Sequence, residues 1–143
     1  MDYKYKYTPE NITSLDKNEV FVFGSNLAGI HGAGAAKLAH TKFGAIYGKG
    51  NGIQGQSYAI PTKDFAIETL EYTNIEKYTQ DFITFARENP KKTFLVTLIG
   101  CGLAGYNPRD IAPLFNSVPL NVILPKEFAN ETYNERFVNE NQI

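Results

Sequence analysis

The 143-residue sequence contains one cysteine, two histidines and no tryptophan. Because Cys101 stands alone, no intramolecular disulfide can form, and one cysteine with two histidines cannot furnish a structural zinc site of the usual spacing. We therefore expect neither a metal site nor a resident cofactor. The scarcity of cysteine also fits a reducing compartment, and we expect a cytoplasmic protein.

Long apolar runs and an excess of charge of one sign are missing as well. No run approaches the length that spans a bilayer, and the opening segment, MDYKYKYTPE, lacks the apolar core of a signal peptide. The 14 basic and 15 acidic residues are mixed along the chain and give a formal net charge of -1. We therefore expect no membrane association and no electrostatic footprint for a nucleic-acid backbone, so any anion must be bound locally.

What the chain does contain is the composition of a globular protein. Hydrophobic residues make up 43% and charged residues 20%, which predicts a packed core rather than a disordered chain. No internal repeat, linker or low-complexity tract divides the sequence. The length is that of one ordinary domain, so we expect residues 1–143 to form a single domain.

Three apolar runs predict strands that are buried on both faces, because Val, Ile, Phe and Leu follow one another there without polar alternation. They cover residues 20–23, 93–99 and 120–124, and a shorter run at 57–61 predicts a fourth strand. Near the N-terminus, Tyr3, Tyr5 and Tyr7 alternate with lysines, a pattern consistent with an edge strand.

Helical segments are predicted between these runs. Residues 74–89 place apolar side chains at three- and four-residue spacing, with Thr73 or Asn74 as the cap. A second helix is expected from about residue 32 to 42, and a third from residue 108 to about 115. Strands that alternate with helices predict an α/β fold, in which helices cover both faces of a mostly parallel sheet.

Two glycine-rich segments occupy the same position in this predicted fold, after a buried strand and before a helix. They read GSNLAGIHGAG from residue 24 and GCGLAGYNP from residue 100. At the carboxyl ends of parallel strands both should face one crevice, where unpaired helix N–H groups and bare glycine backbone favour a phosphate. A tight turn is the better explanation for either loop alone, but the pair predicts a phosphate-binding site. Neither matches the P-loop sequence or the dinucleotide fingerprint.

The same segments resemble a known family. FVFGSN at 21–26 with HGAGAAKLAHTKFGA at 31–45, and IGCGLAGYNPRDIAPLF at 99–115, are similar to the two ligand loops of macrodomains, in particular the small deacylating branch that includes terminal ADP-ribose protein glycohydrolase. With the strand at 57–63, the resemblance covers about half of the chain. It implies a three-layer α/β/α fold with a mixed, mostly parallel sheet. It also implies a cleft for ADP-ribose or a related NAD-derived nucleotide, free or attached to a protein.

In that family the first loop approaches the distal ribose and the second wraps the diphosphate. The resemblance therefore assigns ligand-binding positions in the first loop to Ser25, Asn26, His31, Gly32, Ala33 and Gly34. In the second loop it assigns them to Gly100, Cys101, Gly102, Leu103, Ala104, Gly105 and Tyr106. Alternatives stay open: Asn26 as a turn-stabilising residue, Tyr106 as a half-buried aromatic, and Cys101 as a small buried residue rather than a nucleophile.

The resemblance is incomplete at the catalytic positions. The deacylating branch pairs a lysine after the middle strand, able to attack the ribose C1″ carbon, with an acidic residue in the second loop. Lys63 in YAIPTKD matches the lysine, whereas Ala104 occupies the acidic position. General acid–base help of the kind such a carboxylate gives is typically worth about 10²–10⁴-fold. Asp64 and Asp110 are near in sequence, and His31 is another group able to activate a water.

We therefore expect a binding module for ADP-ribose or a related NAD-derived nucleotide. Two alternatives stay open. One is an ADP-ribosyl hydrolase that removes ADP-ribose from protein or nucleic acid, with Lys63 as its catalytic residue, and the other is an α/β domain that binds another phosphorylated metabolite. The glycine-rich, uncharged part of the segment at 47–57 is either a flap over the ligand or a surface loop.

Overall fold

The computed structural model describes residues 4–138, and in that part of the chain it has one five-stranded sheet and four α-helices. The strands are β1 (Glu19–Asn26), β2 (Gly52–Gln54), β3 (Ser57–Lys63), β4 (Thr93–Val96) and β5 (Val122–Ile123), in the order β2-β3-β1-β4-β5. β1 runs parallel to β3 and β4, β5 runs parallel to β4, and β2 pairs antiparallel with β3. The predicted α/β class with a mostly parallel sheet is confirmed.

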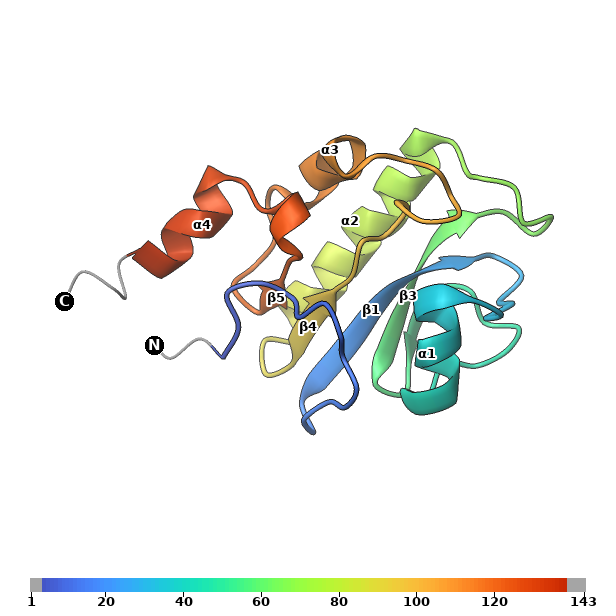
Figure 1. Ribbon diagram of the computed structural model, residues 1–143, viewed down its shortest axis with the longest axis horizontal. Helices are drawn as coiled ribbons and strands as arrows, with labels where there is room; N and C mark the ends of the chain where they lie inside the picture. Colours follow the sequence, from blue (N-terminus) through green and yellow to red (C-terminus); the bar gives the residue numbers. More distant parts are fainter. Residues whose placement is uncertain (1–3, 139–143) are drawn as a thin grey trace.

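The helices are α1 (Gly34–Lys42), α2 (Tyr72–Glu88), α3 (Pro108–Ile111) and α4 (Glu131–Val138), with 3₁₀ turns at Ala112–Phe115 and Lys126–Phe128. Figure 1 shows α1 and α2 on opposite sides of the central strands. The two connections β1–α1–β3 and β3–α2–β4 therefore place one helix on each face of the sheet.

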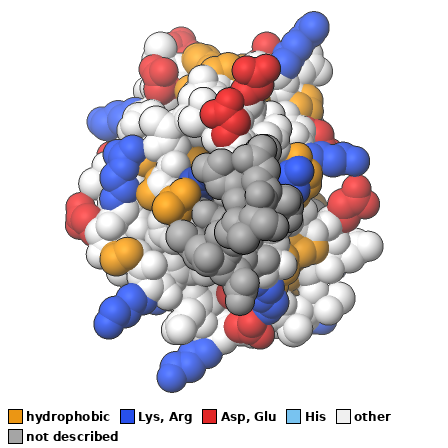
Figure 2. Space-filling view, turned by 90° about the vertical axis from the view of Figure 1, so that its left-hand side faces the viewer, with side chains coloured by type: hydrophobic (Ala, Val, Ile, Leu, Met, Phe, Trp, Pro, Cys, Tyr) orange, Lys and Arg blue, Asp and Glu red, His pale blue; other side chains and the backbone are white. Residues whose placement is uncertain are grey.

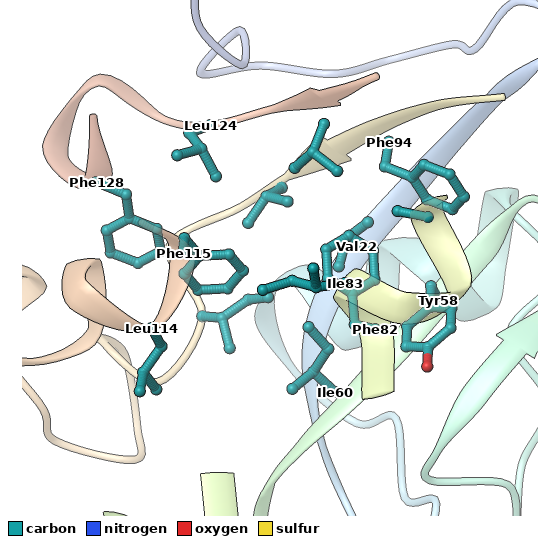
Figure 3. Packing of buried hydrophobic residues seen from close by; sticks show 14 of the residues in the cluster. Val22, Tyr58, Ile60, Phe82, Ile83, Phe94, Leu114, Phe115, Leu124 and Phe128 are labelled. Atoms are coloured by element: carbon teal, nitrogen blue, oxygen red, sulfur yellow. The ribbon is translucent and has the colours of Figure 1, made fainter. Parts of the chain in front are cut away.

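The alternation of side chains along β1 divides the core between these two faces. Val20 and Val22 belong to the larger core, which includes Phe82 and other residues of α2. Phe21 and Phe23 point the other way, into a smaller core that contains Ala39 of α1. Figure 3 shows the larger core, in which aromatic rings from α2, β4 and the 3₁₀ turns pack together. Burial on both faces explains why the run at 20–23 is entirely apolar.

Two predicted strands are longer than the strands that form. After β4, the N–H of Thr97 donates to Val22 O at 3.1 Å, and the N–H of Ile99 donates back to Thr97 O at 2.8 Å. This second bond closes a tight turn that takes the chain out of the sheet, so the run predicted at 93–99 pairs only as far as residue 96. Of the run predicted at 120–124, only β5 joins the ladder.

The edge strand predicted near the N-terminus is not formed by residues 4–10, and Tyr3 lies outside the described residues. Thr8 instead lies beside the end of β5. Its N–H donates to Leu124 O at 2.9 Å, and its hydroxyl donates to Ile123 O at 3.1 Å. The segment is therefore held at the sheet edge by two bonds from one residue.

The predicted helices form with shifted ends. Glu71, rather than Thr73 or Asn74, occupies the N-cap of α2. The helix predicted from residue 108 to about 115 is α-helical only as far as Ile111. Pro113 has no N–H to donate along the helix, so the α-helical pattern cannot continue through it and the chain tightens into a 3₁₀ turn.

Charges of both signs are mixed on the face of the molecule near α4. Figure 2, which faces the α4 end of the molecule, shows basic and acidic side chains interspersed around that face. Within residues 4–138, none of the helices has the length and apolar character that a membrane span requires.

Candidate functional site

A cavity of about 540 Å³ lies at the carboxyl ends of β1 and β3 and beside the segment that follows β4. Because β1 lies between two parallel neighbours, three strand ends meet at this edge of the sheet. The lining comes from four segments: residues 24–26, residue 30 with residues 32–36, residues 62, 63 and 67, and residues 97–104. Pockets for small ligands commonly measure ~300–1,000 Å³, so the cavity has the size of a ligand site.

The two glycine-rich loops converge on this one cavity. The first contributes Gly32, Ala33 and Gly34, which lead into the first turn of α1, and the second contributes residues 100–104. The first loop follows β1 and the second follows β4, and these two strands are parallel neighbours in the sheet. The arrangement expected from their shared position in the sequence is the one that the structure has.

The first loop is held by side chains that the sequence analysis assigned to the ligand. The side-chain amide of Asn26 donates to Ile30 O at 2.8 Å and accepts the Ile30 N–H at 2.9 Å. The hydroxyl of Ser25 donates to Gly50 O. Both residues line the cavity, but these polar groups already have protein partners. The turn-stabilising role considered for Asn26 is the role that the structure gives its side chain.

Several residues that line the cavity have main-chain N–H groups without a protein partner in the described part of the chain. In the second loop, the N–H groups of residues 102–104 have no hydrogen-bond partner among residues 4–138. In the first turn of α1, Gly34, Ala35 and Ala36 line the cavity, and the first N–H groups of any α-helix lack intrahelical partners. Two sets of backbone donors therefore border the same space, which suits an anion.

Lys63 supplies the charge of the site. It ends β3, lies half-buried, and is the one Lys, Arg, Asp or Glu among the described residues that line the cavity. Cys101 also lines the cavity, but burial, with Asp110 and Glu127 nearby, raises the pKa of its thiol to about 11. The thiol is therefore protonated at neutral pH and is a poor nucleophile.

Three residues assigned to the ligand do not line the cavity. His31 is 1% exposed, and its Nε2 lies 2.9 Å from Ile46 O. Gly105 donates its N–H to Gly102 O, and the Tyr106 hydroxyl donates to Leu70 O at 2.9 Å. The partner of His31 lies in the 44–50 segment, that of Gly105 in the second loop itself, and that of Tyr106 in the segment after β3. The spacing of residues in the sequence does not reveal these contacts.

The two carboxylates considered as replacements for the missing acid are used elsewhere. Asp64 Oδ1 accepts the N–H groups of Ala66 at 2.8 Å and Glu68 at 3.0 Å, which shapes the turn after β3. Asp110 accepts the N–H of Asn107 at 3.3 Å and caps α3. Neither lines the cavity. Among residues 4–138, no group of three His, Cys, Asp or Glu side chains is placed to hold a metal ion.

The cavity has an apolar rim that was not expected from the sequence. Ile30, Ile67, Leu98 and Leu103 line it and are each at least 39% exposed. Ile67 has a φ of 63°, a conformation that a β-branched residue rarely adopts, and the Asp64 turn holds it there. The segment at 47–57, considered as a flap, contributes nothing to the lining and instead supplies the edge strand β2.

A second hollow, of about 270 Å³, adjoins the cavity and shares Gly34, Ala35 and Thr97 with it. Its other walls are mainly apolar and come from residues 9–12, β1 and α1.

Neither protein-family models nor curated proteins nor solved structures match this chain. The chemistry of the site is therefore inferred from its own residues.

Proposed function

We propose that this protein binds ADP-ribose or a related NAD-derived nucleotide in the cavity at the carboxyl ends of its strands. The observation that carries the proposal is the convergence of the two macrodomain-like loops on one cavity that also contains Lys63. An ADP-ribose ligand brings two phosphates that the backbone donors of both loops can share. The ammonium group of the half-buried residue Lys63 offsets part of their charge.

The adjoining hollow supports a nucleotide rather than a bare phosphate. An adenine ring needs an apolar surface and a group that accepts a hydrogen bond from its amino group. The hollow offers the half-buried Ile12 and Leu38 as apolar surface and has Glu10 among its lining residues. Because the two spaces share three lining residues, one ligand can extend from one into the other.

Calorimetric titration with ADP-ribose tests the proposal, and Gly102 gives it a sharp variant. A side chain built at Gly102 meets no heavy atom within 4 Å, so Gly102→Glu projects into open space and adds a negative charge where phosphate would bind. Repulsion of that charge predicts at least roughly tenfold weaker binding. The matched control is Gln80→Glu, which adds the same charge on the exposed surface of α2.

Two results would contradict the proposal. The first is no heat of binding from the wild-type protein at millimolar ADP-ribose, which would favour another phosphorylated metabolite. The second is wild-type affinity in Gly102→Glu, which would remove the diphosphate from the second loop.

A second candidate function is ADP-ribosyl hydrolysis, and the position of Lys63 in the cavity favours it. The missing carboxylate weighs against it, because Ala104 lines the cavity and Asp64 and Asp110 do not. Incubation with glutamate- and serine-ADP-ribosylated proteins separates the two functions. A hydrolase should release ADP-ribose in a manner abolished by Lys63→Ala and retained in Lys77→Ala, an exposed lysine of α2. No release by the wild type would leave binding alone.

A further inference from the structure

Two hydroxyl groups connect the second glycine-rich loop to the segment that follows β3. Thr69 Oγ1 donates to Ala104 O at 3.0 Å, and the Tyr106 hydroxyl donates to Leu70 O at 2.9 Å. The bonds run in opposite directions, since each segment provides one hydroxyl and one carbonyl. We name these four residues, Thr69, Leu70, Ala104 and Tyr106, the clasp.

On one side the clasp is fixed to the strand that carries Lys63. Thr69 pairs with Lys63 in an isolated antiparallel bridge, and the N–H of Leu70 donates to Thr62 O at 2.9 Å. Both Thr62 and Lys63 line the cavity. The position of residues 69 and 70 is therefore set by the end of β3.

On the other side the clasp contacts the second glycine-rich loop, which makes few hydrogen bonds to the rest of the described residues. The bonds from Gly105 N–H to Gly102 O and from Tyr106 N–H to Gly100 O are internal to the loop. Within residues 4–138, the Thr69 hydroxyl is the one hydrogen-bond partner that residues 102–105 have outside the loop. The loop residues with free N–H groups are thus positioned relative to Lys63 through this contact.

We propose that the clasp positions the second loop for binding, with Thr69 and Tyr106 as positioning residues that do not contact the ligand. The inference rests on the proposed function, because the affected ligand is the one bound by the loop and Lys63. Loss of either hydroxyl frees residues 102–104 to move relative to β3, and the donors then no longer sit at fixed positions for phosphate. Tyr106, expected from sequence to touch the ligand, acts instead through the loop.

Thr69→Val tests the clasp, because it keeps the shape of the side chain and removes the donor. One lost hydrogen bond predicts roughly fivefold weaker ADP-ribose binding by calorimetry. Thr69→Ser restores the hydroxyl and is expected to restore most of the affinity. The matched control is Thr41→Val, because the exposed Thr41 hydroxyl bonds only to carbonyls of its own helix, and wild-type affinity is expected there. Tyr106→Phe is expected to weaken binding in the same way as Thr69→Val.

A second measurement does not need the ligand. Backbone ¹⁵N order parameters of residues 102–104 are expected to fall in Thr69→Val and Tyr106→Phe and to stay at wild-type values in Thr69→Ser and Thr41→Val. Unchanged order parameters in both clasp variants would overturn the proposal, whatever the affinities. Reduced order parameters in a protein whose wild type binds no ADP-ribose would support the clasp and refute the proposed function, so the two failures are distinguishable.

Discussion

At the scale of single residues, the glycines of the two loops and of the segment at 47–57 divide into two groups with different physical roles. A Cβ at Gly29 would lie 2.3 Å from Lys49 N, and a Cβ at Gly50 would lie 1.9 Å from Asn26 O, so these glycines let two backbone segments approach each other. Gly102 has open space around it and lines the cavity. Glycine thus allows close packing between the first loop and the segment at 47–57, and it leaves open space beside the cavity at Gly102.

This division predicts that one added methyl group destabilises the protein at Gly50 and has little effect at Gly102. Gly50→Ala forces a side-chain carbon into the Asn26 carbonyl, and overpacking of this kind typically costs about 1–3 kcal/mol in the free energy of unfolding. Gly102→Ala is expected to leave the free energy of unfolding within about 0.5 kcal/mol of wild type, because nothing lies near the new methyl group. Urea denaturation of both variants measures the difference. Equal stability of the two variants would contradict the close approach at Gly50.

At the scale of helices and strands, the fold could be predicted where local pattern and tertiary environment agree. The run at 20–23 is apolar because β1 is buried on both faces, and the spacing of Ile75 and Phe82 follows the buried face of α2. The strand predicted at 93–99 was too long because composition does not show where a turn begins. The turn closed by the bond from Ile99 N–H to Thr97 O decides that point.

The site was predictable to a similar extent. The position of both loops at strand ends follows from the order of strands and helices, so their convergence could be inferred before the structure. The partners of His31 and Tyr106 could not, because Ile46 and Leu70 lie in other segments and are reached only after folding. The apolar rim also gave no signal, since isolated Ile and Leu residues in loops follow no period. Tertiary contacts therefore decide which residues of each loop line the cavity.

Asn121 offers a test of how neighbouring elements are joined. Its side-chain amide donates to Ala86 O at 2.9 Å, Lys92 O at 3.0 Å and Asn89 O at 3.1 Å, which ties the end of α2 and the turn before β4 to the start of β5. Asn121→Ala leaves these carbonyls without that donor and is expected to lower the free energy of unfolding by about 1–3 kcal/mol. The exposed Asn51→Ala is the control, with little change expected. A loss no larger than that of the control, measured by urea denaturation, would show that water replaces the amide.

At the scale of the whole molecule, the nearly balanced charge means that an anion would be bound by local contacts and not drawn in by long-range attraction. With 14 basic and 15 acidic residues, the protein has no net field to draw in a nucleotide, and Figure 2 shows both signs on one face. Under the proposed function, recognition then comes from short-range donors and Lys63 in the cavity. This is why Thr69→Val and Tyr106→Phe, which leave the overall charge unchanged, are still expected to weaken binding.

Burial of neutral titratable groups predicts that the folded protein loses stability at alkaline pH. Burial raises the pKa of Tyr58 from 10.0 to about 12, with Asp81 nearby, and the pKa of Cys101 from 9.0 to about 11. Well below pH 9 both groups are neutral in either state, and this contribution to stability is fully present. As pH rises, the unfolded chain releases protons that the folded protein retains, so stability falls until the folded pKa values are passed.

Urea denaturation across this range should show the decline. Tyr58→Phe, which keeps the ring in the core of Figure 3 and removes the phenol, should flatten the curve between about pH 10 and pH 12, and a curve as steep as wild type would contradict this account.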